Sequence, residues 1–368
     1  MATHENVRIV FHTLSQKTAF PLVIWVIALV LFVTCHHCTN EWERRMHYQP
    51  MEIPELAPHA VGRYVIGFPK GVILLNWCQT LRGLGKIKIT RNVSQSEWEQ
   101  KVKIRANHFQ SIPHNRGGTQ FEKIVKLNIP YSASVLYWPD DISPKGNDLW
   151  CETYYLKENV LFEVRIYIDV VPKDQENDLH RLEDTLRSIR FLQPNEIPKE
   201  PGACFDGAML MDAPERLYSE MVGASILWPD RPDVRFEFLV SDNGDRPDPP
   251  LLTRLKRANA IPLLGVLRSR ARVVGGIPGE EHLERVTESN GTVSHLFIWE
   301  AQGLPNRFDH PQIRLDMSTG HGKDAPIHST LSDEDALKLW DAVLDSLHWR
   351  PTEPPTQAGP RTLPGRQS

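Results

Sequence analysis

The residues of this chain whose types and spacing could do chemistry gather in GGIPGEEHLERVTESNGTVSHLFIWEAQG, residues 275–303. Two adjacent acids and a histidine follow a glycine-rich turn, and a second histidine and another acid come after them. Carboxylates and imidazoles in such number could serve as general acids and bases or as zinc ligands. The stretch therefore raises the hypothesis of a hydrolase of unrecognised type that uses Glu281, His282, His295 and Glu300.

The same stretch carries a strong signal for a β-hairpin. Asn290-Gly291 lies between two runs of alternating hydrophobicity, which predicts a type I′ turn. Pairing outward from a two-residue turn places His282 opposite Trp299 and puts Glu281 on the other face of the sheet. A zinc protease instead needs two histidines one helical turn apart, with the acid between them, on a helix. We therefore predict a hairpin with one packed face and one solvent-exposed face, and no metal site.

Other catalytic and binding patterns are missing from the sequence. There is no G-x-S-x-G, no phosphate-binding Walker loop and no G-x-G-x-x-G. The net charge of −4 and the lack of a basic stripe argue against a nucleic-acid partner. No catalytic residue and no cofactor are therefore predicted.

One segment near the N-terminus differs from the rest of the chain. Residues 18–40 contain no Asp, Glu, Lys or Arg, and their apolar heart AFPLVIWVIALVLFVTC is 17 residues long. That length is at the short end of what spans a bilayer as a helix, so we expect an uncleaved single-pass anchor in the inner membrane. The alternatives are a buried core helix, a cleaved signal peptide and a lipoprotein modified at Cys35. The folded domains follow the span and are expected in the periplasm.

The chain contains five cysteines, at positions 35, 38, 78, 151 and 204. Cys35 and Cys38 enclose two histidines, but no second ligand pair follows at zinc-finger spacing. Cys35 stays a candidate lipidation site. Cys78 and Cys151 are a candidate disulfide pair in an oxidising compartment, which sequence alone does not establish.

A proline-rich segment, QPNEIPKEPGA, divides the part after the anchor into two halves of similar plan. Each half contains strand-like runs, a helix in the middle and a helix at the end. The predicted fold class is α+β: two related domains, each a mainly antiparallel sheet with a central and a C-terminal helix, preceded by one N-terminal transmembrane helix. The predicted order is a short tail (1–17), the membrane anchor (18–40), a stalk (41–60), an N-terminal domain (61–192), a linker (193–203), a C-terminal domain (204–351) and a disordered tail (352–368).

Capping residues predict where two of these helices begin. Ser94 or Ser96, each followed three residues later by a glutamate, can cap the central helix of the first half. Ser332 is expected to cap the closing helix of the second half. That last helix is expected to turn one apolar face inward: Ala336, Leu337, Trp340, Val343, Leu344 and Leu347.

The turn LWPDRPD contains residue types that are common at binding hot spots. Trp228 and Arg231 lie on it, and the alternative is an ordinary Pro-Asp turn with a buried tryptophan. With the hairpin, this turn supplies the candidate partner-binding residues: Trp228, Arg231, Glu281, His282, Glu284 and Trp299.

Several motifs of the second half occur in a familiar order. ACFDGAML, WPDRPDVRFEFLVSDNG, GIPGEEHLERV, FIWEAQG, IRLDMSTG and ALKLWDAVLDSLHWRP resemble the C-terminal domain of type VI secretion lipase-immunity proteins. The similarity is to the Tli family, cognate to the fourth class of Tle phospholipase effectors. VGRYVIGFPKG resembles the start of the N-terminal domain of the same family. The resemblance extends over about residues 61–351 and is denser in the second half.

The resemblance implies a non-enzymatic immunity protein. Such a protein binds a cognate lipase effector, an α/β-hydrolase phospholipase, and blocks its substrate entrance with two domains that grip the effector. A membrane anchor suits this role, because the phospholipids under attack lie in the membrane that holds the inhibitor. The alternatives are a membrane-anchored structural envelope adaptor and the hydrolase of unrecognised type.

Overall fold

The computed structural model of the protein describes residues 51–81, 85–114, 117–139, 148–212, 220–241, 249–257, 265–289, 291–305, 307 and 310–350. The chain from Ile53 onward forms one unit. Within these ranges, no helix has the length and hydrophobicity needed to cross a bilayer. The predicted anchor at 18–40, the predicted tail at 352–368 and Cys35 all lie outside the described residues.

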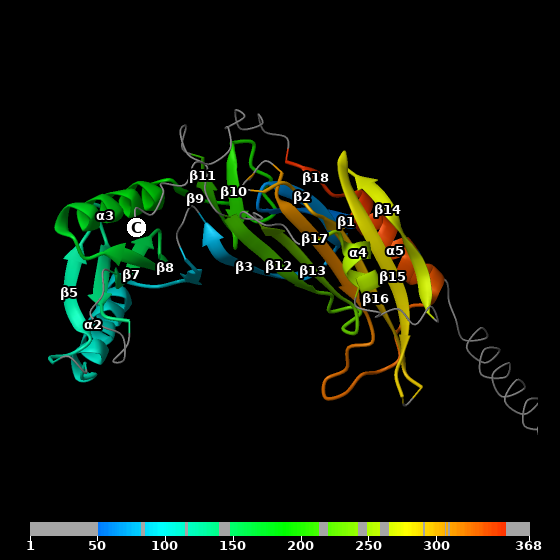
Figure 1. The fold of residues 1–368 in the computed structure, drawn as a ribbon, viewed down its shortest axis with the longest axis horizontal. Helices are drawn as coiled ribbons and strands as arrows, with labels where there is room; N and C mark the ends of the chain where they lie inside the picture. The colour runs from blue at the N-terminus through cyan, green and yellow to red at the C-terminus, as the bar shows by residue number, and fades with distance from the viewer. Residues whose placement is uncertain are drawn as a thin grey trace, which may run out of the picture. The chain divides into compact units, whose positions relative to one another are not determined.

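Twelve strands form the largest sheet, in the order β14-β15-β16-β17-β13-β12-β3-β4-β8-β7-β6-β5 (Figure 1), and each neighbouring pair is antiparallel. Its strands, in chain order, are β3 (Ile73–Leu81), β4 (Ile87–Arg91), β5 (Phe121–Lys126), β6 (Ser132–Tyr137), β7 (Asp148–Lys157), β8 (Val160–Asp169), β12 (Glu220–Leu227), β13 (Arg235–Ser241), β14 (Val266–Val274), β15 (Ile277–Thr287), β16 (Val293–Ala301) and β17 (Gln312–Ser318).

Two smaller antiparallel sheets accompany it. One has the order β1-β2-β18, from β1 (Leu56–Val61), β2 (Tyr64–Pro69) and β18 (His348–Trp349). The other has the order β10-β11-β9, from β9 (Ile189–Phe191), β10 (Gly202–Phe205) and β11 (Ala208–Met211). The first of these joins strands from the two ends of the described chain.

Four helices lie among the described residues: α2 (Gln95–Ser111), α3 (Pro172–Arg187), α4 (Leu251–Arg257) and α5 (Asp333–Asp345). Ser94 caps α2, and its hydroxyl and Glu97 form the reciprocal bonds of a capping box, as predicted. Ser332 caps α5, and its hydroxyl accepts from the Asp335 amide at 3.1 Å. The predicted α+β class with mainly antiparallel sheets is therefore confirmed.

The large sheet takes strands from both sides of the proline-rich segment at 193–203. β3 from the first half pairs with β12 from the second over eight positions, from Ile73 opposite Leu227 to Leu81 opposite Glu220. Backbone pairing thus joins the two halves directly. Their division into two domains stays a prediction.

The predicted disulfide between Cys78 and Cys151 is wrong, because Cys151 is a free, buried cysteine. Cys78 lies on β3 and pairs with Ile87 of β4, which pairs with Val164 of β8, which in turn pairs with Thr153 of β7. Three strand spacings of about 4.8 Å separate the two cysteine strands by roughly 14 Å. A disulfide spans Cα atoms only up to about 7 Å.

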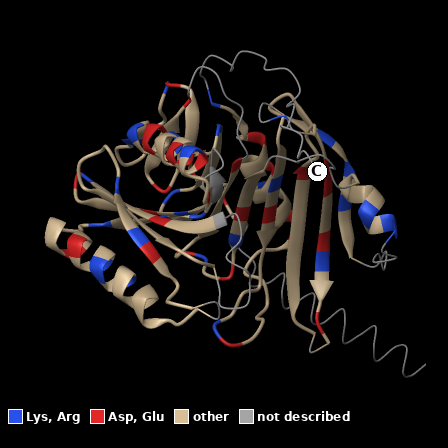
Figure 2. Ribbon diagram, turned by 60° about the vertical axis from the view of Figure 1, so that its left-hand side comes forward, with Lys and Arg blue, Asp and Glu red and all other residues tan. Residues whose placement is uncertain are grey.

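Acidic and basic residues are interspersed along these helices and strands, as Figure 2 shows. In the hairpin of β15 and β16, the acids Glu281 and Glu300 are buried.

Candidate functional site

β15 and β16 form the predicted hairpin, but its turn is one residue longer than predicted. The Gly291 amide donates to the Glu288 carbonyl at 2.9 Å, and the Glu288 amide donates to the Thr292 carbonyl at 2.8 Å. Gly291 has a left-handed φ of 81°, as expected at the end of a three-residue turn. The register therefore shifts by one residue, and Trp299 lies opposite Glu281.

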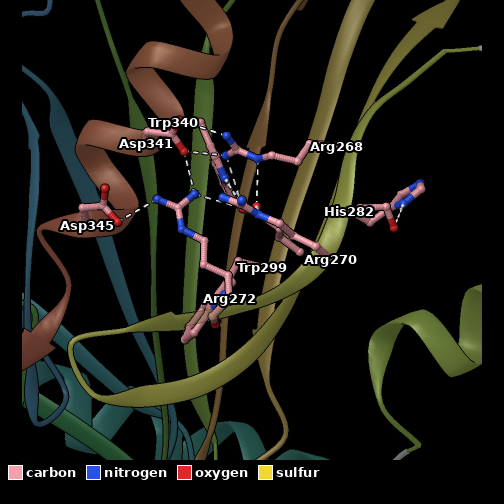
Figure 3. A network of polar contacts seen from close by, with 10 residues as sticks. Arg268, Arg270, Arg272, His282, Trp299, Trp340, Asp341 and Asp345 are labelled. Carbon is pink, nitrogen blue, oxygen red and sulfur yellow. Dashed lines mark hydrogen bonds and ion pairs between the residues drawn. The ribbon is translucent and has the colours of Figure 1, made fainter.

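The four candidate catalytic residues of this hairpin are buried, so neither face of the hairpin presents them to solvent, which corrects the prediction of a solvent-exposed face. The exposed fractions are 0% for Glu281, 4% for His282, 2% for His295 and 3% for Glu300. Helix α4 packs against β15, and helix α5 packs against β14 and β16. Figure 3 shows His282 apart from Arg268, Arg270 and Arg272, which surround Glu281, so these two side chains do separate as predicted.

Glu281 lies among three arginines of the neighbouring strand β14, and Figure 3 shows these arginines side by side. Arg268 and Arg270 place their Nε atoms 2.8 and 2.9 Å from its Oε1, and Nη1 of Arg272 is 3.0 Å from its Oε2. The Trp340 indole of α5 also donates to Oε2, at 3.3 Å. Residues two apart on a strand share a face, which is why these arginines converge on one carboxylate.

Two aspartates of α5 complete the cluster. Nη1 of Arg268 donates to Asp341 at 3.0 Å, and Nη2 of Arg272 donates to Asp345 at 2.6 Å. Asp341 and Asp345 are one helical turn apart and therefore share a face of α5. Three arginines and three carboxylates balance, so the cluster fastens α5 to the sheet without a net charge.

The pKa values of Glu281 and Asp341 are both lowered, which favours their ionised forms. Burial opposes ionisation of Glu281, but hydrogen bonds from Arg270 and Arg272 and the charge of Arg268 outweigh it and lower its pKa. Burial likewise opposes ionisation of Asp341, and hydrogen bonds from Arg268 and Arg272 outweigh it and lower that pKa. A carboxyl with a lowered pKa carries no proton at neutral pH and cannot serve there as a general acid.

We expect the stability of the protein to fall when the pH drops through the range of these carboxyls. A lowered folded-state pKa gives stability that is complete above the unfolded-state pKa, about 4. That stability is lost as the pH falls through the folded-state pKa. Denaturant titrations at several pH values measure the free energy of unfolding. The difference in this free energy between the wild type and Glu281→Gln should become smaller below about pH 4. A difference in the free energy of unfolding between the wild type and Glu281→Gln that stays constant as the pH falls would contradict the assignment.

The opposite face of the hairpin holds helix α4. Glu280 and Glu300 lie directly opposite one another in β15 and β16. The Leu252 amide at the start of α4 donates to Glu280 at 2.8 Å. Arg254 donates two parallel hydrogen bonds to Glu300, at 2.8 and 2.7 Å. These bonds offset the repulsion of two like charges that face each other across the sheet.

His295 lies between a hydroxyl and a carboxylate in an arrangement like a catalytic triad. Its Nδ1 is 2.9 Å from Thr319 Oγ1, and its Nε2 is 3.0 Å from Asp333 Oδ1. The hydrogen bond from His295 is the main reason why the pKa of Asp333 is lowered, and the charge of Arg285 adds to it against burial. The Thr319 hydroxyl is buried and also accepts the His295 amide at 2.9 Å. His295 therefore connects β16 to the start of α5. The buried Thr319 hydroxyl presents no nucleophile to a substrate.

The turn with Trp228 and Arg231 is docked onto a neighbouring loop. The guanidinium carbon of Arg231 lies 5.9 Å from the centroid of the Trp228 ring. Asp233, 1% exposed, accepts the Thr330 amide at 2.9 Å and the Thr330 hydroxyl at 2.8 Å. The tryptophan is buried, which agrees with the alternative of an ordinary turn.

Burial separates the six predicted partner-binding residues into two groups. The side chains of Trp228, Glu281, His282 and Trp299 are buried and are not available for surface contacts. Glu284 keeps 27% of its side chain exposed, 3.5 Å from His282 Nε2. Arg231 is also partly exposed. Of these six residues, Arg231 and Glu284 therefore have side chains that a partner could contact.

A second buried ion cluster was missed in the sequence. Arg63, in the turn between β1 and β2, donates to both oxygens of Glu220 at 3.0 and 2.6 Å. It also donates to both oxygens of Asp212, at 2.7 Å each. Single charges spaced 149 and 157 residues apart leave no local pattern. The cluster around Glu281 does leave a local pattern, because arginines at 268, 270 and 272 alternate along the strand and predict one charged face.

Comparisons with known proteins agree with this architecture. Residues 196–352 match the family model of the Tle cognate immunity protein 4 C-terminal domain. No curated protein matches the chain. A chain in the crystal structure of a Tle4–Tli4 complex is 24% identical, with a TM-score of 0.70 over 82% of this chain and 100% of that one. The apo immunity protein TplEi of the type VI system of Pseudomonas aeruginosa is 24% identical, with a TM-score of 0.69 over 81% of this chain and 98% of its own.

The fold is thus that of type VI immunity proteins, since both solved structures are matched along almost their whole length. Residues 196–352 match the C-terminal domain of the Tle cognate immunity protein 4 family, so the resemblance predicted from the sequence is confirmed for that part of the chain. The matched family model and the matched apo structure are both described as immunity proteins.

Proposed function

We propose that this chain binds and neutralises a cognate type VI antibacterial phospholipase and so protects the membranes of its own cell. The observation that carries the proposal is the match of residues 196–352 to the immunity-protein domain. The solved relative that shares its fold is named as a partner in a Tle4–Tli4 complex. The buried state of the catalytic candidates supports a binding role, because none of these four side chains can meet a substrate.

Blocking of the lipase's substrate entrance is part of the proposal. A preformed antiparallel scaffold suits it, because a rigid surface binds without first ordering itself. We also propose that residues 18–40 anchor the chain in the inner membrane with residues 53–350 in the periplasm. The apolar stretch at 19–35 supports this placement.

The test uses the full chain and a purified candidate effector, an α/β-hydrolase phospholipase. Titration of the chain into the lipase is expected to give a stable complex and a stoichiometric loss of phospholipid hydrolysis on vesicles. A soluble short-chain ester serves as a second substrate. A blocked entrance should stop hydrolysis of both the ester and the vesicle phospholipid, whereas a chain that only keeps the lipase off the membrane should leave hydrolysis of the ester unchanged. A wild-type chain that neither binds the lipase nor reduces hydrolysis would overturn the proposal. Binding with undiminished hydrolysis would instead support a structural adaptor.

A further inference from the structure

A groove of about 740 Å³ lies between helix α3 and the edge strand β5. It lies in the first half of the chain, apart from the polar clusters of the hairpin. α3 contributes one of its faces, including Gln175, Leu179 and Glu183, and β5 and the turn that follows it contribute the opposite wall. The volume is within the range of sites that hold several side chains or a small ligand.

Helix α3 covers the sheet with only part of its length. Leu182 and Leu186, in its C-terminal half, are 1% and 0% exposed. Leu179 belongs to the same helical spacing but is half-buried and lines the groove with Val125 and Pro172. The apolar face of α3 therefore continues past the sheet core and ends in a groove that no described residue fills.

The charges around this apolar floor are mainly negative. Three carboxylates line the groove, those of Glu122, Glu176 and Glu183, against one ammonium, that of Lys123. With His180 counted as neutral, the lining has a formal charge of −2, from three negative groups and one positive group. Nη2 of Arg187, which is not part of the lining, lies 3.8 Å from Glu183, so Glu122 and Glu176 carry most of the negative charge that a partner would meet.

Hydrogen bonds hold most of these groups in place. Glu122 accepts the Trp138 indole at 3.1 Å, and Glu183 accepts the Asn128 amide at 2.6 Å. Lys123 donates to Gln175 at 2.6 Å. The wall of the groove is thus preorganised, while Glu176 is exposed on its rim.

We propose that this groove binds a segment of the partner lipase that carries an apolar side chain next to lysine or arginine. The apolar side chain would complete the packing of Leu179, and the cation would meet the carboxylates. An anionic phospholipid headgroup or an acidic segment would be repelled by the same lining. The inference rests on the proposed function and adds to it a location and a chemical class of contact.

The test measures the affinity of full-length variants for the purified candidate phospholipase that the wild-type chain binds. Glu176→Lys reverses a charge on the rim without touching the core, and we expect it to weaken Kd about tenfold at low salt. The loss should shrink at high ionic strength, because exposed charges are screened. Leu179→Ala tests the apolar contact and is expected to weaken Kd about tenfold at any salt concentration. Glu99→Lys makes the same charge change on the exposed part of α2 and should stay within about twofold.

Thermal melts of each variant show whether weaker binding comes from a lost contact or from unfolding. If Leu179→Ala proves unstable, the exposed variant Glu176→Lys still tests the groove. If the wild type binds the lipase and both groove variants bind within twofold of it, the groove inference is overturned and the proposed function stands. If the wild type does not bind, both are overturned. Equal weakening by Glu99→Lys would also overturn the inference, because it would show a general charge effect.

Discussion

Glu281→Gln is expected to lower the free energy of unfolding by about 3–5 kcal/mol, the usual loss when one partner of a buried ion cluster is removed. Glutamine keeps the shape of the side chain but removes the charge that Arg268, Arg270 and Arg272 surround. Three guanidinium groups would then face one another with only the aspartates of α5 to compensate them. The carboxylate is 0% exposed, so water cannot replace it.

Equilibrium denaturation of the full chain measures this loss. The matched control is Glu334→Gln on α5, where the side chain is 73% exposed and pairs with Lys338. An exposed pair one helical turn apart contributes about 0.3–0.5 kcal/mol. A loss for Glu281→Gln that is no larger than that of Glu334→Gln would contradict the role of the cluster.

Arg63→Ala should lower the free energy of unfolding by a similar amount, about 3–5 kcal/mol. The substitution leaves the carboxylates of Asp212 and Glu220 next to each other with no cation between them. Because Arg63 makes paired hydrogen bonds to both, lysine is not an equivalent replacement. Arg63→Lys keeps the charge and is expected to lose about 1–3 kcal/mol.

Arg91→Ala is the control for Arg63. Its side chain is 47% exposed and pairs with Asp206 at 3.3 Å, so its removal should cost less than about 1 kcal/mol. Unfolding curves for the three variants should therefore order the losses as Arg63→Ala, Arg63→Lys and Arg91→Ala. An Arg63→Ala protein as stable as Arg91→Ala would show that the cluster contributes nothing.

The features that could be predicted from the sequence are those determined by nearby residues. The caps at Ser94 and Ser332 depend on residues three positions away, and both are formed. The inward face of α5 was predicted from helical spacing, and Ala336, Trp340 and Val343 on it are buried. Local periodicity also gave the hairpin and the mainly antiparallel fold class.

The turn of the hairpin was only partly predictable. Asn-Gly is common in two-residue turns, but glycine with a positive φ also ends a three-residue turn. The alternation of side chains is the same in both, so periodicity does not choose between them. The difference of one residue determines whether Glu281 or His282 faces Trp299.

The burial of the hairpin's acids could not be predicted from the hairpin itself. Glu281 is compensated by β14 and by α5, which lies about 60 residues further along the chain, and Glu300 by Arg254 from α4. A strand sequence with charged residues predicts one exposed face unless the residues that neutralise those charges are known. Those partners depend on the tertiary fold, as do the contacts of Arg63.

The buried acids affect how a genetic screen of this protein should be interpreted. Under the proposed function, a cell that carries a substitution at Glu281, Glu300 or Arg63 would lose protection because misfolded chains are removed by proteases and the amount of inhibitor falls. Under the groove proposal, substitutions at exposed Glu176 would weaken protection with the amount of protein unchanged. Immunoblotting beside each survival assay would therefore separate residues that maintain the cellular supply of the inhibitor from residues that meet the toxin.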